Sequence, residues 1–227
     1  MVLKYEIRRS AKRKNVTITV ERDRAVVVHA PMGLPEEKLR QLVDGKRQWL
    51  FEKLNDAQKY QPLPHAPGKE LVNGESALYL GRAYRIELVD AADAGVRFAG
   101  KFLIPRSRAS ERKQVLRQWY MERAQERILP RVNLHARNLG VSYAQVKISD
   151  SRLRWGSCTP GNNLNFNWRL IKAPIFVIDY VIVHELAHLM EPNHTARFWN
   201  IVRAQLPSME RARDWLRVQG QSLEDDI

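Results

Sequence analysis

The segment DYVIVHELAHLMEPNHTARFW, residues 179–199, constrains the fold of this chain more than any other part of its sequence. Apolar residues fill most positions of 175–190, and we expect a buried helix that begins at Pro174. His184 and His188 are four residues apart, so a helix places both imidazoles on one face, one turn from each other. Because polar side chains inside a buried helix need a partner, the sequence predicts that these two imidazoles share a bound cation.

Glu185, beside the first histidine, completes the pattern H-E-x-x-H. In this arrangement the two histidines hold a metal ion, and the glutamate holds and deprotonates a metal-bound water. Three of the six histidines of the 227-residue chain fall within positions 184–194. A buried helix with satisfied core histidines is the structural alternative, but it explains neither the adjacent carboxylate nor the third histidine. We therefore expect a catalytic metal centre.

The third protein ligand can come from His194, Glu191 or Glu210, and His194 is favoured. The spacing HELAHLMEPNH equals that of H-E-x-x-H-x-x-G-x-x-H, and the Glu-Pro-Asn break lets the chain fold back toward the metal. Glu191 is about 10 Å along the helix axis from His184, and the following Pro192 pushes it out of the helical conformation. Three neutral imidazoles and an open fourth position favour one Zn²⁺ per chain, although Ni²⁺, Co²⁺ or Mn²⁺ can bind the same ligands.

A strand with an unusual polar face precedes this helix. Polar and apolar residues alternate completely over 163–170, which predicts a half-buried strand. Asn165 and Asn167 on its polar face, together with Arg154, are predicted to contact the substrate, and an extended peptide can pair with the edge of this strand. Ordinary sheet structure is the alternative. The candidates for stabilising an oxyanion are Arg154, Ser157 and Tyr180.

The remaining sequence indicates an α+β protein. In the first hundred residues, alternating segments such as NVTITVE and AYRIELV predict strands, with one helix that starts at Pro35. A long helix is expected from about residue 110 until before Gly140. We expect a β-rich N-terminal region over residues 1–105 and a catalytic domain over residues 106–227, in which the buried metal-binding helix packs on a small sheet.

The charge balance raises a second kind of partner. The chain has 38 Lys and Arg against 25 Asp and Glu, a net charge of +13, which favours a polyanion such as a nucleotide or nucleic acid. A basic protein without such a partner is the alternative. The sequence lacks an apolar run of about 18 residues, so we expect no contact with a membrane. Since the first ten residues carry several charges without the apolar core of a signal peptide, and Cys158 is the only cysteine, we expect a cytoplasmic protein.

Four segments together resemble the YgjP-like family of zinc metallopeptidases, which is related to the SprT-like and Wss-type proteases. They are WGSC at 155–158, LNFNWRL, DYVIVHELAHL and NHTARFW. The segments YEIRRSAKRKNVTITV and YLGRAYRIEL are similar to that family too, so the resemblance covers nearly the whole chain. It implies a zincin-like α+β fold, with His184, His188 and His194 as metal ligands and Glu185 as the catalytic carboxylate. The counterpart of the family's strand asparagine is either Asn165 or Asn167.

The sequence thus predicts a zinc metallopeptidase that cleaves peptide or protein substrates with a water activated by Glu185. One alternative is a pyrophosphatase-like hydrolase of nucleoside triphosphates, which the basic charge favours, although the chain has no Walker-type loop. Another is a DNA-associated protease, as the SprT resemblance suggests. A purely structural zinc site is the fourth hypothesis, but a closed site has no use for a base at position 185.

Overall fold

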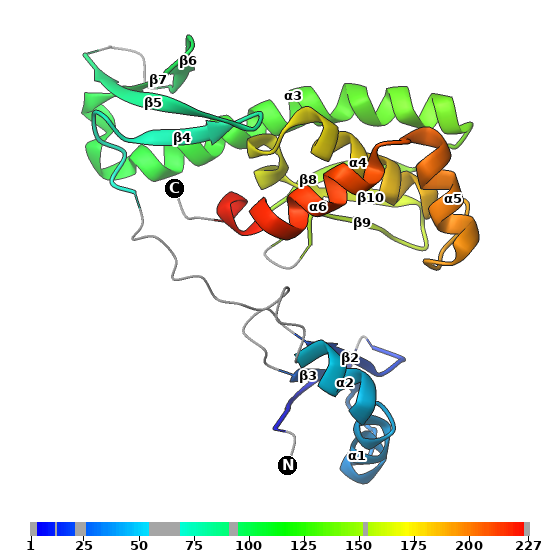
Figure 1. Cartoon of the computed structure of the whole chain (residues 1–227). Helices are drawn as coiled ribbons and strands as arrows, with labels where there is room; N and C mark the ends of the chain where they lie inside the picture. The colour runs from blue at the N-terminus through cyan, green and yellow to red at the C-terminus, as the bar shows by residue number, and fades with distance from the viewer. Residues whose placement is uncertain are drawn as a thin grey trace. The chain divides into compact units, whose positions relative to one another are not determined.

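The computed structural model describes residues 4–11, 13–20, 26–54, 69–90, 95–151 and 154–224. The chain divides into two compact units, Met1–His65 and Ala66–Ile227. The boundary predicted after residue 105 lies inside the second unit, where buried side chains from both sides of that position share one hydrophobic core. The architecture is α+β in both units (Figure 1).

The first unit is a small sheet packed with two helices. Its elements are β1 (Glu6–Ser10), β2 (Thr17–Val20), β3 (Val26–Pro31), α1 (Glu36–Asp44) and α2 (Arg47–Leu54). Strand β3 is central, parallel to β1 and antiparallel to β2. Valine side chains of β3 pack with Leu39, Val43 and Leu50 from the helices. The sequence predicted one helix here, but the first helix ends at Gly45, whose N–H bonds back to Gln41, and a second helix follows.

The second unit holds two further sheets and the remaining helices. The elements of its first part are β4 (Ser76–Tyr79), β5 (Arg82–Val89), β6 (Arg97–Phe98), β7 (Phe102–Pro105), the 3₁₀ turn η1 (Arg106–Glu111) and α3 (Arg112–Leu139). Those of its second part are β8 (Gln145–Ser149), β9 (Gly156–Cys158), β10 (Asn163–Asn167), η2 (Trp168–Lys172), α4 (Ile175–Ala187), α5 (Ala196–Gln205), α6 (Met209–Gln219) and η3 (Gly220–Leu223). The strand orders are β4-β5-β7-β6 and β8-β10-β9.

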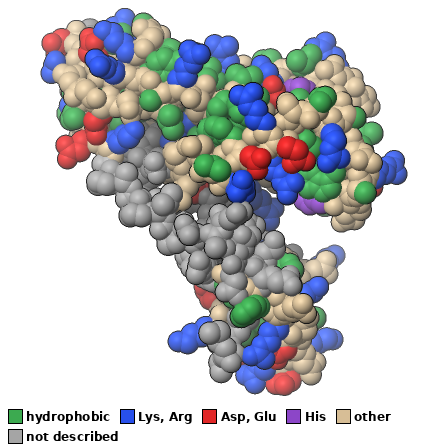
Figure 2. Space-filling view, in the orientation of Figure 1, with side chains coloured by type: hydrophobic (Ala, Val, Ile, Leu, Met, Phe, Trp, Pro, Cys, Tyr) green, Lys and Arg blue, Asp and Glu red, His purple; other side chains and the backbone are tan. Residues whose placement is uncertain are grey.

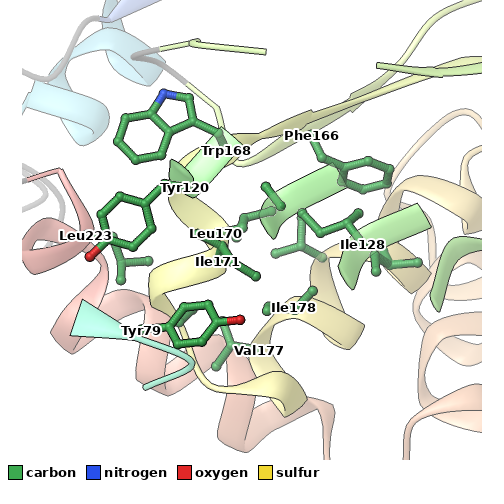
Figure 3. Close-up of a cluster of buried hydrophobic side chains, with 14 of the residues drawn as sticks. Tyr79, Tyr120, Ile128, Phe166, Trp168, Leu170, Ile171, Val177, Ile178 and Leu223 are labelled. Atoms are coloured by element: carbon green, nitrogen blue, oxygen red, sulfur yellow. The ribbon is translucent and has the colours of Figure 1, made fainter. Parts of the chain in front are cut away.

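Helix α3 connects the two sheets of this unit (Figure 1). Near its start, the ring of Trp119 packs edge-on against Tyr79 and Phe102 of the four-stranded sheet, with centroids 5.1 and 5.2 Å apart. The neighbouring Tyr120 stacks on Trp168 of η2 at 5.8 Å, and its hydroxyl donates to the Leu78 carbonyl at 2.6 Å. These aromatic contacts place both sheets and α4 on one core (Figure 3).

The three-stranded sheet ends earlier than the sequence pattern indicated. Strand β10 stops at Asn167, and the residues after it form η2, in which every side chain is buried. The carbonyl oxygen of the Asn167 side chain accepts from the Arg169 N–H at 3.0 Å, and its amide donates to the Ser151 carbonyl at 2.5 Å. The predicted strand over 163–170 was therefore too long, because Asn167, the fifth residue of β10, caps a 3₁₀ turn.

Helix α4 is surrounded by protein on nearly all sides, as its apolar sequence predicted. Its one carboxylate on the α3 side, Asp179, accepts two hydrogen bonds from Arg131, at 2.5 and 2.6 Å, and contacts His135 at 3.1 Å. Burial alone would raise the pKa of Asp179, but these hydrogen bonds outweigh it and the pKa is lowered. In the described part of the chain, every helix is too short or too polar to cross a membrane.

The start of α4 is fixed by the turn between β4 and β5. Leu80 and Gly81 both have positive φ, 49° and 81°, as a tight hairpin turn requires. Their N–H groups donate to the carbonyls of Ile171 and Lys172 in η2, each at 2.9 Å. A Cβ on Gly81 would lie 2.6 Å from Cγ of Pro174, so only glycine lets the hairpin approach the residue from which α4 begins.

Candidate metal centre

The first two candidate ligands lie at the C-terminal end of α4. His184 is in its last turn, and His188 follows directly after Ala187 with the backbone still in the helical region. Their ring centroids are 5.1 Å apart, as one helical turn predicts. Nδ1 of His188 lies 3.3 Å from the carbonyl oxygen of Glu191. If Nδ1 carries the proton for this hydrogen bond, the lone pair of Nε2 is left to bind a metal.

A capped turn brings the third histidine back to this pair. After α4 the chain turns through residues 189–193, and Glu191 donates its N–H to the Ala187 carbonyl at 2.9 Å. Thr195 then caps α5 by accepting a hydrogen bond from the Phe198 N–H at 3.3 Å. The cap fixes the backbone beside His194, whose Nε2 lies 3.0 Å from Nε2 of His184. The prediction that the chain folds back after Glu-Pro-Asn therefore matches the observed course of the backbone.

Aromatic rings hold the three imidazoles in place. The buried ring of Phe198 lies 4.9 Å from His184, 4.6 Å from His188 and 4.7 Å from His194, measured between centroids. The indole of Trp199 stacks on His194 at 5.6 Å and meets His184 at 5.8 Å. Nδ1 of His184 is buried and has no hydrogen-bond partner among the described residues. The orientation of His184 therefore comes from ring packing.

The three histidines fit a divalent metal ion. One ligand nitrogen from each lies within 4.8 Å of the others. Two nitrogens bound to a tetrahedral zinc at about 2.0 Å would be about 3.3 Å apart, close to the 3.0 Å between His184 and His194. Burial, together with the charges of the other two histidines, lowers the pKa of His184 to about 3, so this ring is neutral at pH 7, as a ligand must be. The pKa of the solvent-exposed His194 is lowered as well, first by desolvation and then by His188.

The other two ligands considered from the sequence do not belong to this group. Among the described residues, the cluster with metal-ligand spacing contains only the three histidines. Glu191 contributes its backbone carbonyl to His188, as described above. Glu210 pairs with two arginines of α5 and α6.

Glu185, next to His184 in the chain, is buried against the backbone of β9. A Cβ on Gly156 would lie 2.7 Å from both Cγ and Oε1 of Glu185, so the carboxylate occupies the space that a side chain at position 156 would need. The side chain of Glu185 is nearly inaccessible to solvent, and this burial raises its pKa to about 7. A hydrogen bond from the Cys158 N–H and the charge of Arg154 act in the opposite direction.

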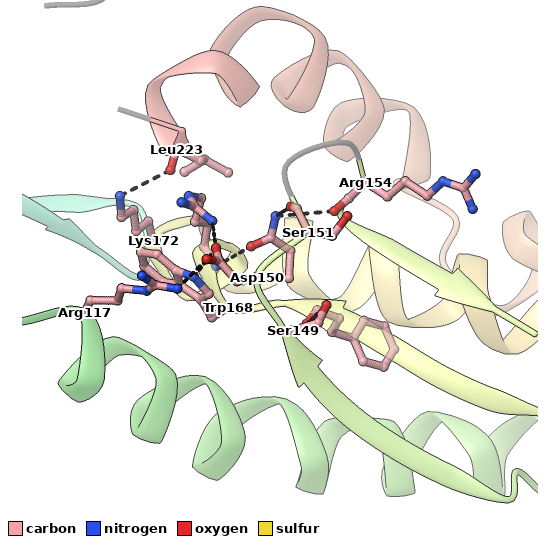
Figure 4. Close-up of polar contacts among 11 residues, drawn as sticks. Arg117, Ser149, Asp150, Ser151, Arg154, Trp168, Lys172 and Leu223 are labelled. Atoms are coloured by element: carbon pink, nitrogen blue, oxygen red, sulfur yellow. Dashed lines mark hydrogen bonds and ion pairs between the residues drawn. The ribbon is translucent and has the colours of Figure 1, made fainter. Parts of the chain in front are cut away.

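Polar contacts stabilise the segment that leads into β9 (Figure 4). Asp150 accepts a hydrogen bond from the Trp168 indole at 2.9 Å and pairs with Arg117 and Arg169. Asn167 donates to the carbonyls of Ser151 and Arg154, the second at 3.3 Å. These contacts connect β9 to η2, so the strand that touches Glu185 is held by the same core as α4.

Strands β8 and β9 form the two edges of this sheet, and β9 is the edge strand that contacts Glu185. Strand β10 lies between β8 and β9, so the peptide pairing predicted for the asparagine-bearing strand is blocked on both sides. Trp155 and Thr159 direct backbone groups toward β10, accepting from the Asn167 N–H and donating to the Asn163 carbonyl. By the alternation of an antiparallel pair, the backbone groups of Gly156 and Cys158 point away from β10, toward the open edge.

The structure does not bring the predicted substrate contacts together. Asn167 is 2% exposed, and its amide is used in the turn contacts described above, which leaves almost no surface for a substrate. Asn165 is paired with Ser157, and its amide donates to that hydroxyl at 3.3 Å. Residues directly opposite each other in a strand pair share one face of the sheet, so Asn165 and Ser157 lie on the same face. Glu185 packs on the other face, against the neighbouring Gly156. A substrate contact by Asn165 stays a prediction. Arg154 is exposed and close enough to act on the pKa of Glu185.

Sequence reasoning missed three residues that shape this site. Gly156, inside the WGSC motif, makes room for the carboxylate, and the motif itself was the available signal. Phe198 and Trp199, at the end of the NHTARFW segment, pack against the imidazoles. The available signal was the position of Trp199 as the fourth residue of α5, because that position commonly packs against the residue before the cap, here His194.

The chain matches a family of known proteins. The family model described as YgjP-like, metallopeptidase domain matches residues 14–219. No curated protein matches the chain. Among solved structures, the metallopeptidase zymogen abylysin of Pyrococcus abyssi is 17% identical over 41% of this chain and 93% of its own, with a TM-score of 0.37. Jannalysin of Methanocaldococcus jannaschii, also a metallopeptidase zymogen, is 21% identical over 38% of this chain and 93% of its own, with a TM-score of 0.32.

Replacing the phenyl ring at position 198 by a smaller side chain tests whether packing orients the three histidines. We expect Phe198→Leu to raise the dissociation constant for Zn²⁺ several-fold and Phe198→Ala to raise it by about 10- to 100-fold, the usual effect of losing an orienting neighbour. The measurement is competition with a chromophoric chelator. Val202→Ala, a buried truncation one turn along α5, controls for the general loss of core packing. Equal zinc affinity in all four proteins would contradict the role assigned to Phe198.

Proposed function

Because the chain belongs to the YgjP-like family of metallopeptidase domains, we propose that it is a zinc-dependent peptidase with His184, His188 and His194 as ligands. The single observation that supports this most is the convergence of three imidazole nitrogens within 4.8 Å, beside a buried carboxylate. Three histidines with one open position form a catalytic zinc site of known type, and the exposed His194 lies on the side that solvent can reach. A zincin-like arrangement of α4 against β9 and β10 is part of this proposal.

The chemistry follows from the groups around that position. A bound zinc ion would polarise the scissile carbonyl and acidify the attacking water. Glu185 accepts the proton of this water and delivers it to the leaving amine. The Cys158 N–H donates a hydrogen bond to its carboxylate, and the positive charge of Arg154 favours the ionised form that accepts the proton. Tyr180, whose ring is 6.0 Å from His184, and Arg154 remain the candidates for stabilising the oxyanion, because Ser157 shares the face of Asn165.

The substrate backbone would bind along β9. An extended peptide can use the outward N–H and C=O groups of Gly156 and the outward C=O of Cys158, which adds one strand to the sheet. Because Glu185 touches Gly156, a peptide bond at this edge lies next to the general base. This position replaces the asparagine-bearing strand as the proposed site of peptide pairing.

Replacing the base is the direct test of the mechanism. We expect Glu185→Gln to keep its zinc, because it is not a ligand, and to lose about 10²- to 10⁴-fold in the rate of peptide hydrolysis, the usual contribution of a general base. Casein and a mixed peptide library serve as substrates, and metal content is measured on the same samples. The alternative derived from the net charge of +13 is tested with UTP and ATP. Glu185-dependent cleavage of a nucleotide, with all peptides intact, would contradict a peptidase.

Adding one methyl group at position 156 tests the contact that positions the base. We expect Gly156→Ala to keep its fold and zinc while kcat falls by about 10- to 100-fold, because the new Cβ displaces a flexible carboxylate. Gly95→Ala is the matched control, since a Cβ there meets nothing within 4 Å. Peptide hydrolysis and thermal unfolding are measured for both variants. An unchanged kcat in Gly156→Ala would show that the carboxylate does not need this position.

A further inference from the structure

A groove between α5 and α6 opens beside the metal centre. It has a volume of about 360 Å³ and is lined by Ala196, Trp199, Asn200, Arg203, Glu210 and Arg213. The four residues from α5 are spaced as one helix face, and the other two come from the first turns of α6. In the space-filling view, basic and acidic side chains lie close together over the region of α6 (Figure 2).

The side chain of Trp199 lies between the groove and the metal centre and contacts both. Its indole lines the groove and also stacks on His194, with ring centroids 5.6 Å apart. Tyr180 links the two regions from α4: its ring is 6.0 Å from His184, and the charges of Arg213, Glu210 and Glu185 all act on its hydroxyl. A peptide with its scissile bond at the metal can therefore extend a neighbouring group into the groove.

The groove has two guanidinium groups and one carboxylate. Arg203 and Arg213 each lie 3.6 Å from Glu210, beyond the range of a normal hydrogen bond. Arg213 also lies over the Trp199 ring, 5.5 Å from its centroid, which fixes the direction of its guanidinium. Both arginines are half-exposed and keep donors that can bind an incoming anion. The net charge of the lining is positive, since one carboxylate faces two guanidinium groups.

We propose that this groove binds a carboxylate of the peptide substrate, which makes Arg203 and Arg213 determinants of specificity. This inference rests on the proposed peptidase function. A planar guanidinium matches a carboxylate through two parallel hydrogen bonds, and the indole of Trp199 and the methyl of Ala196 offer an apolar surface to the carbon atoms that carry it. The carboxylate comes either from an acidic side chain or from the C-terminus of the substrate. Glu210 competes for the same arginines and lowers the affinity of the groove for the substrate carboxylate.

The test is peptide binding to the zinc-loaded full chain that carries Glu185→Gln, so that nothing is hydrolysed. Three alanine-based hexapeptides are compared by calorimetry: one blocked at both ends with a central glutamate, one blocked with a central glutamine, and the glutamine peptide with a free C-terminus. We expect one of the two anionic peptides to bind about tenfold more tightly than the blocked glutamine peptide. Which one binds more tightly identifies the source of the carboxylate.

Variants of the groove assign this preference to its residues. We expect Arg213→Gln to abolish the tenfold ratio and Glu210→Gln to increase it, because the first removes a donor and the second removes the competing carboxylate. Arg217→Gln, on the same helix but outside the groove lining, removes the same charge and is expected to keep the ratio. Equal binding of the three peptides, no binding of any, or a ratio that survives in Arg213→Gln would overturn the proposal.

The binding and hydrolysis experiments test the groove proposal and the peptidase proposal separately. If the anionic peptide is preferred but the wild-type protein cleaves no peptide, the groove is an anion site and the peptidase proposal is wrong. If the wild type cleaves peptides in a Glu185-dependent manner without this preference, the peptidase proposal stands and the groove has another role.

Discussion

The architecture of the centre depends on how three imidazoles are made to converge. Two of them need only a helix, because residues four apart point to the same side. The third needs the chain to reverse within six residues after His188 and stop at a defined place. Thr195 provides that stop by capping α5, and the first turn of the same helix then supplies Phe198, whose ring contacts all three histidines. One short segment thus contributes the third histidine, the cap that places it and the ring that packs against all three imidazoles.

Burial of α4 explains the environment of Glu185. A helix enclosed by α3, α5, α6 and the three-stranded sheet removes Glu185 from water, which raises its pKa to about 7. The same enclosure requires the neighbouring strand to leave room, and β9 does so with Gly156. The contacts that hold β9, through Asn167 and Asp150, belong to the core that also surrounds α4. A substitution in that core therefore shifts the Glu185 carboxylate even when the substituted residue does not contact it.

The sequence predicted those features that depend on local periodicity. The buried helix and the single face shared by His184 and His188 follow from spacing alone, and the family expected from the short motifs is confirmed by the family model. The end of β10 could not be predicted, because alternation continues through Trp168 while the side chain of Asn167 starts a 3₁₀ turn. The face of the sheet on which Asn165 lies could not be predicted either, because it depends on the pairing of Asn165 with Ser157. The groove could not be predicted because it depends on how α5 and α6 pack. These features arise from contacts between distant segments, which periodicity does not encode.

The X-ray absorption spectrum of the zinc-loaded full-length protein at the zinc edge tests the central claim most directly. Coordination by His184, His188 and His194 predicts three nitrogen ligands at about 2.0–2.1 Å with the outer-shell pattern of imidazole, together with one oxygen. A sulfur ligand at about 2.3 Å, which only Cys158 or a methionine could supply, would contradict the account, and so would fewer than three imidazoles.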